Sequence, residues 1–164
     1  MKFEIKPFAA LFESGEFQEM FEEAFGCTYA KKLASSYDEF KPEEIGLLFD
    51  NSTKVSFFSF KREKDFVFLI ELGYLQAAAK HLRYSYFISI VEALHELGFQ
   101  DVGTCLPVID RRGIINCLSI GFDIIGCRQT ERNLQVQLDH SATNFIPSKS
   151  IYLKTNFTAN GIMH

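Results

Sequence analysis

The chain has 164 residues, 47% of them apolar, and a formal net charge of −4. This length suits one domain with its own core, and the apolar content excludes an intrinsically disordered chain. The negative charge provides no basic face for nucleic acid, and no apolar run reaches the roughly 18 residues of a membrane span. We therefore expect neither a nucleic-acid partner nor a membrane partner.

The four cysteines are spaced too irregularly for a zinc site, and they contain no CxxC pair. The first residues, MKFEIKPFAALFESGEF, lack the long apolar core of a secretory signal. These features predict a cytoplasmic protein with free thiols and no metal.

The first 40 residues alternate between strand and helix patterns. Residues 2–8 alternate apolar and polar side chains, as a strand does. Ser14 is predicted to cap a helix that Gly26 ends. Its apolar residues recur at helical spacing and form one face: Phe17, Met20, Phe21, Ala24 and Phe25. Residues 29–38 are predicted to form a shorter helix.

Three strands are predicted next, at residues 46–51, 55–62 and 65–75, and the short polar turns between them indicate an antiparallel meander. The third strand is apolar almost throughout, so we expect a central position with both faces covered.

The middle strand carries phenylalanines on both of its faces, at positions 57, 58 and 60. We expect some of these rings to be exposed and to form a homodimer contact.

The second half returns to helices. A helix over residues 83–97 is predicted to end at Gly98. Its predicted buried face is Phe87, Ile90, Val91, Leu94 and Leu97. A strand over 101–109 follows, and then a helix over 110–120 with Ile114, Ile115 and Leu118 inward.

The chain is predicted to close with a hairpin of residues 122–128 and 134–138. Residues 143–164 form a polar tail in which 150–154 can be a short strand. This gives a domain of residues 1–142 followed by a tail. The element order is β-α-α-β-β-β-α-β-α-β-β, which predicts an α/β (α+β) fold with a mixed sheet.

The segment LGFQDVGTCLPVIDRRGIINCLSIGFDIIGCR, residues 97–128, resembles the C-terminal half of the GNAT (GCN5-related N-acetyltransferase) superfamily. That family has a strand, an Asn-led helix, a Gly-Phe step and a strand with an "IIG" sequence. Here Asp110 replaces the Asn, Gly121 and Phe122 form the step, and residues 124–126 read Ile-Ile-Gly. The element order extends the resemblance to residues 1–140.

The resemblance implies a GNAT-like fold and an acyltransferase that uses acetyl-CoA or another acyl-CoA as co-substrate. The pantetheine arm would pair with the strand 65–75, so this correspondence assigns Leu72, Gly73, Tyr74 and Leu75 to cofactor binding. Asp110 is assigned by its position at the start of the helix.

The pyrophosphate of the cofactor would bind at the start of the helix 83–97, where main-chain N–H groups and the helix dipole favour an anion. The family's loop is glycine-rich, but this chain has no glycine between Tyr74 and Leu97. Its matching residues are Arg83, Tyr84, Ser85 and Tyr86. Either these residues still hold a phosphate, or the tyrosines fill the loop and prevent binding.

Two residues are catalytic candidates. Glu71 is the one carboxylate in the strand FVFLIELGYL, where burial would raise its pKa and suit a general base. Alternatively, it faces solvent or an open cleft. Cys117 takes the place of the family's general-acid tyrosine, four residues before Gly121. It can donate a proton, become acylated or simply pack as a small buried thiol. His81 is a weaker candidate for a base or a phosphate contact.

Three functions therefore remain open. The first is N-acyl transfer from acyl-CoA to an amine of a small molecule or a protein. The second is a non-catalytic binding or structural module with a GNAT-like fold that has lost CoA binding. The third is transfer from an acyl carrier protein recognised through Arg111 and Arg112.

Overall fold

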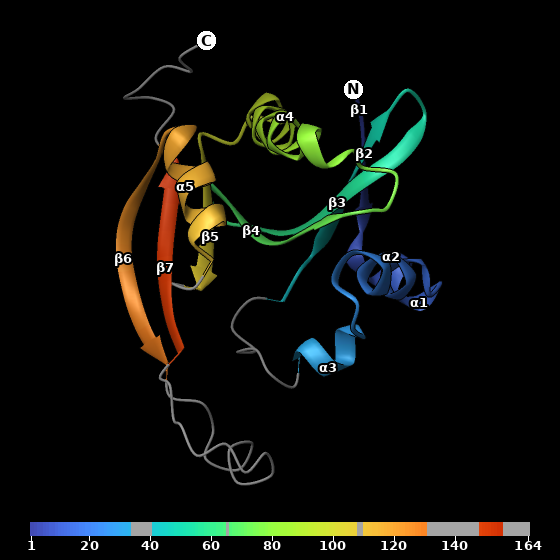
Figure 1. The fold of residues 1–164 in the computed structure, drawn as a ribbon, viewed down its shortest axis with the longest axis horizontal. Helices are drawn as coiled ribbons and strands as arrows, with labels where there is room; N and C mark the ends of the chain where they lie inside the picture. Colours follow the sequence, from blue (N-terminus) through green and yellow to red (C-terminus); the bar gives the residue numbers. More distant parts are fainter. Residues whose placement is uncertain (34–40, 65, 108–109, 131–147, 156–164) are drawn as a thin grey trace, which may run out of the picture. The chain divides into compact units, whose positions relative to one another are not determined.

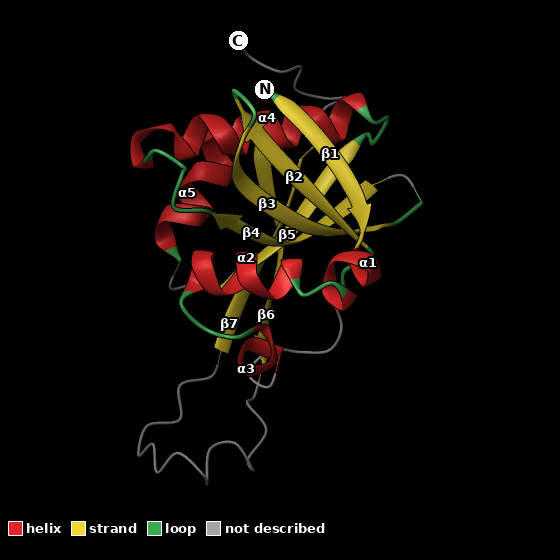
Figure 2. Cartoon of the chain, turned by 90° about the vertical axis from the view of Figure 1, so that its right-hand side faces the viewer, coloured by secondary structure: helices red, strands yellow, loops and turns green. Residues whose placement is uncertain are grey.

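The computed structural model describes residues 1–33, 41–64, 66–107, 110–130 and 148–155. The chain forms two compact units, Met1–Val102 and Gly103–His164. Figure 1 follows the elements along the chain, and Figure 2 separates helices from strands by colour.

A four-stranded antiparallel sheet forms the centre of the first unit. Its strands are β1 (Lys2–Pro7), β2 (Glu44–Asp50), β3 (Thr53–Arg62) and β4 (Phe66–Tyr74), each paired with the next. The predicted first strand and the predicted meander are therefore confirmed.

Helices cover both faces of this sheet (Figures 1 and 2). On one face lie α1 (Phe8–Glu13), α2 (Glu16–Phe25) and α3 (Tyr29–Leu33). On the other lie the 3₁₀ turn η1 (Lys80–Leu82) and α4 (Arg83–Glu96). The helix predicted over residues 29–38 is thus α3, and residues 34–38 fall outside the described residues.

The start of α2 corrects one prediction. Gly15, with φ of 83°, occupies the N-cap position, and Ser14 instead ends α1, a helix that the sequence analysis missed. The Ser14 hydroxyl still accepts from the Glu16 N–H at 3.4 Å. Gly26 ends α2 with φ of 68°, as predicted, because only glycine adopts that conformation without strain.

The phenylalanines of β3 point alternately to the two faces of the sheet. Phe57 packs against α2, with its ring centroid 5.7 Å from that of Phe17. Phe58 and Phe60 stack on the opposite face at 5.7 Å. All three rings are at most 1% exposed, so the expectation of exposed rings is wrong and the dimer loses its basis.

The most buried strand is β3 rather than β4. Every residue of β3 from Val55 to Phe60 is buried. In β4, Val67, Leu69 and Gly73 are buried and the other residues are half-buried. Since helices lie on both faces of the sheet and no residue of β4 is exposed, the prediction that both faces of this strand are covered is confirmed, although β3 is the more deeply buried.

The predicted buried face of α4 is confirmed at Phe87, Ile90, Val91 and Leu94. Leu97 is 50% exposed, because it is the C-cap residue, and Gly98 with φ of 94° turns the chain away.

The second unit contains a three-stranded antiparallel arrangement in which β7 (Ser148–Thr155) lies between β5 (Asp101–Pro107) and β6 (Phe122–Thr130). The strand allowed at residues 150–154 therefore exists, within the segment expected as a tail. It pairs with β6, and residues 134–138, the predicted hairpin partner, lie outside the described residues.

The helix α5 (Arg111–Ser119) is short and buries little. Its buried residue is Cys117, whereas Ile115 is 63% and Leu118 is 43% exposed. The prediction that these two side chains face inward is wrong. In a helix of nine residues the covered stripe is narrow, and it follows Cys117 and the half-buried Gly113 and Ile114.

The predicted α/β class and element order are confirmed, with α1 and η1 as additional short elements. Within the described parts of the chain, no helix has the length and apolar character needed to cross a membrane.

Candidate functional site

The end of β4 is tied to the start of α4 by one pair of residues. The Tyr74 hydroxyl donates to the Arg83 main-chain oxygen at 2.9 Å. The Arg83 guanidinium in turn lies 5.2 Å from the centroid of the Tyr74 ring, a cation–π distance. This pair fixes the first turn of α4 relative to the strand that precedes it.

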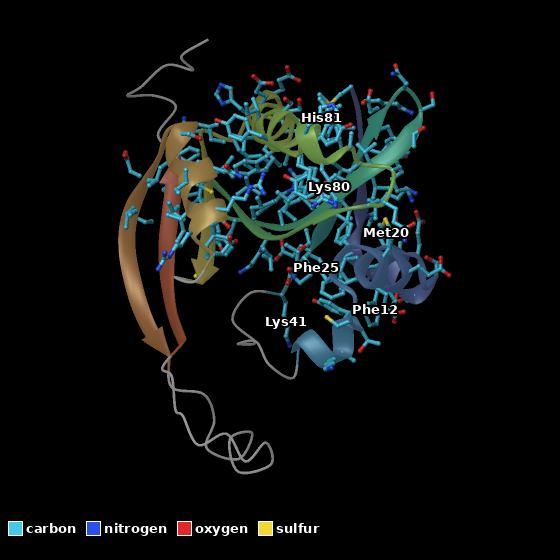
Figure 3. All side chains as sticks on the ribbon, viewed as in Figure 1. Phe12, Met20, Phe25, Lys41, Lys80 and His81 are labelled. Carbon is cyan, nitrogen blue, oxygen red and sulfur yellow. The ribbon has the colours of Figure 1, made fainter. Side chains whose placement is uncertain are left out.

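That first turn has the chemistry of an anion site. Leu82, at the N-cap, makes no side-chain cap, and the first turn contains no acidic residue. Lys80 and His81 precede it, and both are labelled at this turn in Figure 3. The first N–H groups of a helix have no partner within the helix, and the dipole adds positive potential.

Arg83 gives a second indication. Its side chain is half-buried, and its Nε is buried without a hydrogen-bond partner in the described structure. A buried donor that lacks a partner is costly, and an anionic oxygen would satisfy it. The turn therefore fits a phosphate group.

The side chains of the three residues after Arg83 differ in exposure to solvent. Tyr84 is 39% exposed and Ser85 is exposed. Tyr86 is 3% exposed and donates to Asp50 Oδ2 at 3.1 Å. Burial, and then the bond to Asp50 and its charge, raise the pKa of Tyr86. Its side chain therefore anchors α4 to β2 and does not fill the turn, which leaves the main-chain N–H groups of Tyr84 and Ser85 as the groups available to a cofactor.

The main chain of β4 has a defined direction near its end. The Leu75 N–H donates to the Val55 oxygen at 3.0 Å, and the Gly73 oxygen accepts from Ser56 Oγ at 2.7 Å, so both point toward β3. Main-chain groups alternate along a strand, so those of Leu72 and Tyr74 point to the other edge. Of the four residues assigned to pantetheine, these two have the suitable direction.

The remaining two residues, Gly73 and Leu75, pack in the core. Leu75 is 5% exposed and belongs to the cluster around α1 and α2. A Cβ on Gly73 would overlap the Phe57 ring and come within 2.9 Å of the Ala24 Cβ. Gly73 is therefore required for close packing of α2, and the structure does not support it as a cofactor contact.

A β-bulge in β4 determines the face of the sheet on which the Glu71 side chain lies. Ser59 pairs with Glu71 and Phe60 pairs with Leu69, so Ile70 is an extra residue, a β-bulge. The bulge places Glu71 on the same face as Gly73, which α2 covers, while Leu69 is on the face of Phe60. Glu71 is half-buried there.

The Glu71 carboxylate affects the pKa of a buried tyrosine, Tyr29. Burial, and then the negative charge of Glu71, raise the pKa of Tyr29 to about 12. The Tyr29 ring is 4.9 Å from Phe17 and 5.1 Å from Phe21. Glu71 therefore lies at an aromatic cluster, and the alternative in which it simply faces solvent is not supported.

The two candidates on the second unit have structural roles. The Asp110 carboxylate accepts from the Gly113 N–H at 2.9 Å and caps α5. Burial, and then the charge of Asp110, raise the pKa of Cys117 to about 12. A thiol of that pKa stays protonated at neutral pH, which is against acylation of Cys117 and against efficient proton donation.

Three features near these residues escaped the sequence analysis: Tyr29 close to Glu71, Ser59 opposite Glu71 in the sheet, and the link from Tyr74 to Arg83. Only Ser59 had a signal, as a hydroxyl inside the apolar run VSFFSF. In the described ranges, no cluster of three or more His, Cys, Asp or Glu residues is arranged to hold a metal ion.

No family model and no curated protein sequence matches the chain. Solved structures do match. The ribosomal-protein-S18-alanine N-acetyltransferase of Escherichia coli is 10% identical, with a TM-score of 0.61 over 99% of this chain and 100% of that one. An IAA acetyltransferase of Bacillus cereus is 11% identical, with a TM-score of 0.58 over 94% and 97%.

A third match is a GNAT family acetyltransferase of Elizabethkingia anophelis with acetyl-CoA bound, which is 11% identical, with a TM-score of 0.57 over 94% and 97%. At such identities the likeness concerns the fold. It extends over nearly the whole chain, as the resemblance of residues 97–128 and the element order predicted. The chain therefore has the fold of the GNAT acetyltransferases.

Proposed function

We propose that this protein transfers an acyl group from an acyl-CoA to an amine. The observation that carries the proposal is the first turn of α4, which has no side-chain cap and no acid and has Arg83 with an unpaired buried Nε. The acetyltransferases with this fold include one crystallised with acetyl-CoA, which supports the same co-substrate here.

The residues present fit the co-substrate. Arg83 and the main-chain N–H groups of Tyr84 and Ser85 would hold the pyrophosphate, with Lys80 nearby. The glycine-free sequence is compatible with this role because Tyr86 turns away into the fold. The Leu72 and Tyr74 main chain would pair with the pantetheine arm. When bound, acyl-CoA supplies the acyl group as an activated thioester.

In the proposed reaction Glu71 is the general base. The amine nitrogen attacks the thioester carbonyl, the C–N bond forms and the C–S bond breaks, and the sulfur leaves as a thiolate. Glu71 takes the proton that the amine loses, directly or through water. Main-chain N–H groups at the β4 edge would stabilise the negative charge on the carbonyl oxygen. The raised pKa of Cys117 leaves solvent as the proton source for the thiolate.

Calorimetry with acetyl-CoA tests the proposal directly. We expect binding, and a loss of about 100-fold in affinity for Arg83→Glu, because one favourable charge becomes a repulsive one. Arg112→Glu is the matched control, since it makes the same charge change in the first turn of α5. Absence of heat and of a thermal shift at millimolar acetyl-CoA would contradict the proposal.

The alternative is a non-catalytic module of the same fold. The observation in its favour is the lack of glycine between Tyr74 and Leu97, since side chains restrict how closely a phosphate approaches the main chain. A folded protein that does not bind acetyl-CoA would support this alternative. Binding of an acyl carrier protein that is lost in Arg112→Glu, with no binding of acetyl-CoA, would instead support the acyl-carrier alternative through Arg111 and Arg112.

A further inference from the structure

Two serines in β3 have the same burial and different partners. Ser56 and Ser59 are both 0% exposed. Ser56 Oγ donates to the Gly73 oxygen at 2.7 Å. Ser59 Oγ is buried and has no hydrogen-bond partner among the residues that the structure describes. An unsatisfied buried hydroxyl requires a physical explanation, because leaving it unpaired destabilises the folded state.

The position of Ser59 suggests that explanation. Ser59 is the register partner of Glu71, and it lies two residues from Phe57, whose ring packs against α2. Residues directly opposite in an antiparallel pair share a face, with Cβ atoms about 4.5–5.5 Å apart. The Ser59 hydroxyl and the Glu71 carboxylate therefore lie side by side on the face of the sheet covered by α2.

The surroundings favour a single polar cluster at this point. Tyr29 is near enough to Glu71 for the carboxylate charge to raise its pKa. Rings of Phe17, Phe21 and Phe57 enclose the same face. In such surroundings a hydroxyl that does not bond the carboxylate directly can share one water with it, and that water satisfies the Ser59 hydroxyl.

We propose that Ser59 is a positioning residue that holds a water against the Glu71 carboxylate, and that this water carries the proton from the acceptor amine to Glu71. The inference rests on the proposed acyl transfer. In the step, the water accepts the amine proton as it gives one of its own to the carboxylate, so that the water is regenerated and Glu71 becomes the acid.

A double-mutant cycle on stability tests the shared water without any substrate. The set is Ser59→Ala, Glu71→Ala and the double variant, with Ser56→Ala as a control of equal burial. We expect Ser59→Ala to lower the Tm by about 2–4 °C, and at most half of that loss in the Glu71→Ala background. An unchanged or higher Tm for Ser59→Ala would overturn the inference, because it would show that the hydroxyl is unsatisfied in the folded protein.

Kinetics with acetyl-CoA and an amine acceptor test the catalytic part. We expect Ser59→Ala to lower kcat at least tenfold with an unchanged KM for acetyl-CoA, and to have no further effect in the Glu71→Gln background. Ser56→Ala should lower the Tm and spare kcat. If Glu71→Gln impairs transfer and Ser59→Ala does not, this inference fails and the proposed function stands. If acetyl-CoA does not bind at all, the proposed function fails, and the stability cycle still decides whether Ser59 and Glu71 are coupled.

Discussion

The N-termini of the helices α4 and α5 solve the same physical problem in different ways. Both helices begin with arginine, and both begin with N–H groups that have no partner within the helix. In α5 a side chain of the chain itself satisfies one of them, because the Asp110 carboxylate accepts from the Gly113 N–H. In α4 no side chain caps the turn, and the first turn contains no acidic residue.

The difference separates a site from a structural turn. A capped helix start is complete without a ligand, whereas an uncapped start beside Arg83 and Lys80 is complete only with an anion or solvent. The start of α2 supports the contrast, since Glu16 and Glu19 provide negative charge in its first turn.

An acidic residue in the first turn of α4 should remove the difference between the starts of α4 and α5. Ser85→Asp places a carboxylate at the third position of the helix, where it interacts favourably with the dipole. We expect the variant to be about 0.5 kcal/mol more stable and to bind acetyl-CoA at least tenfold more weakly. Thermal unfolding and calorimetry measure the two effects. Ser85→Asn is the neutral control, and equal weakening in both variants would contradict an electrostatic cause.

The raised pKa of Cys117, the buried residue of α5, predicts that the folded protein becomes less stable at alkaline pH. The folded pKa of Cys117 is raised from 9.0 to about 12, so the unfolded chain loses this proton first as the pH rises. Stability should be constant below about pH 9 and then fall by about 1.4 kcal/mol per pH unit toward pH 12. Tyr29, raised from 10.0 to about 12, adds to the fall above pH 10.

Denaturant unfolding at a series of pH values measures this loss. In Cys117→Ala the decline should begin one unit higher, near pH 10, where Tyr29 and Tyr86 contribute, since the pKa of each is raised in the folded protein. The same decline in the wild type and the variant would show that Cys117 is not the titrating group.

Asp110→Ala tests whether the capped start of α5 has a structural role only. Loss of the cap should destabilise the protein by about 1 kcal/mol, and Asp110→Ser should recover most of it. Acetyl-CoA affinity should be the same in both variants if Asp110 is a cap only. Weaker binding in Asp110→Ala with full affinity in Asp110→Ser would assign the cofactor a contact with this residue.

The smallest expected effect concerns Lys80, whose side chain is exposed at the turn ahead of α4. A single exposed charge contributes little, so Lys80→Ala should weaken acetyl-CoA binding about twofold at low salt and less at high salt. Lys2→Ala, on β1, is the control. A tenfold effect for Lys80→Ala would mean that this lysine contacts the phosphate directly.

Local patterns were sufficient for most of the elements. The helical spacing from Phe17 to Phe25 and the stop at Gly26 predicted α2, and the alternation of short polar turns with apolar runs predicted the meander. The helix followed by Gly121-Phe122 placed α5 and β6 correctly. These features depend on neighbours in sequence, which is why the sequence reveals them.

The failures depend on partners distant in sequence. Nothing near Tyr86 indicates that its hydroxyl meets Asp50, and nothing near Gly73 indicates that Phe57 and Ala24 occupy its open side. The bulge at Ile70, which decides the face of Glu71, exists only in the pairing of β4 with β3. The candidate residues could therefore be assigned to their helices and strands from the sequence, but the directions of their side chains and main-chain groups could not be predicted.

The position of β7 has a consequence for the order in which the protein is made. The last described strand of the chain lies between two strands that are synthesised earlier, β5 and β6. Until the ribosome has released Ser148–Thr155, those two strands expose main-chain groups along the edges that β7 will occupy. The second unit can pair these strands only after Ser148–Thr155 has emerged, whereas the four strands of the first unit can pair with one another earlier in synthesis.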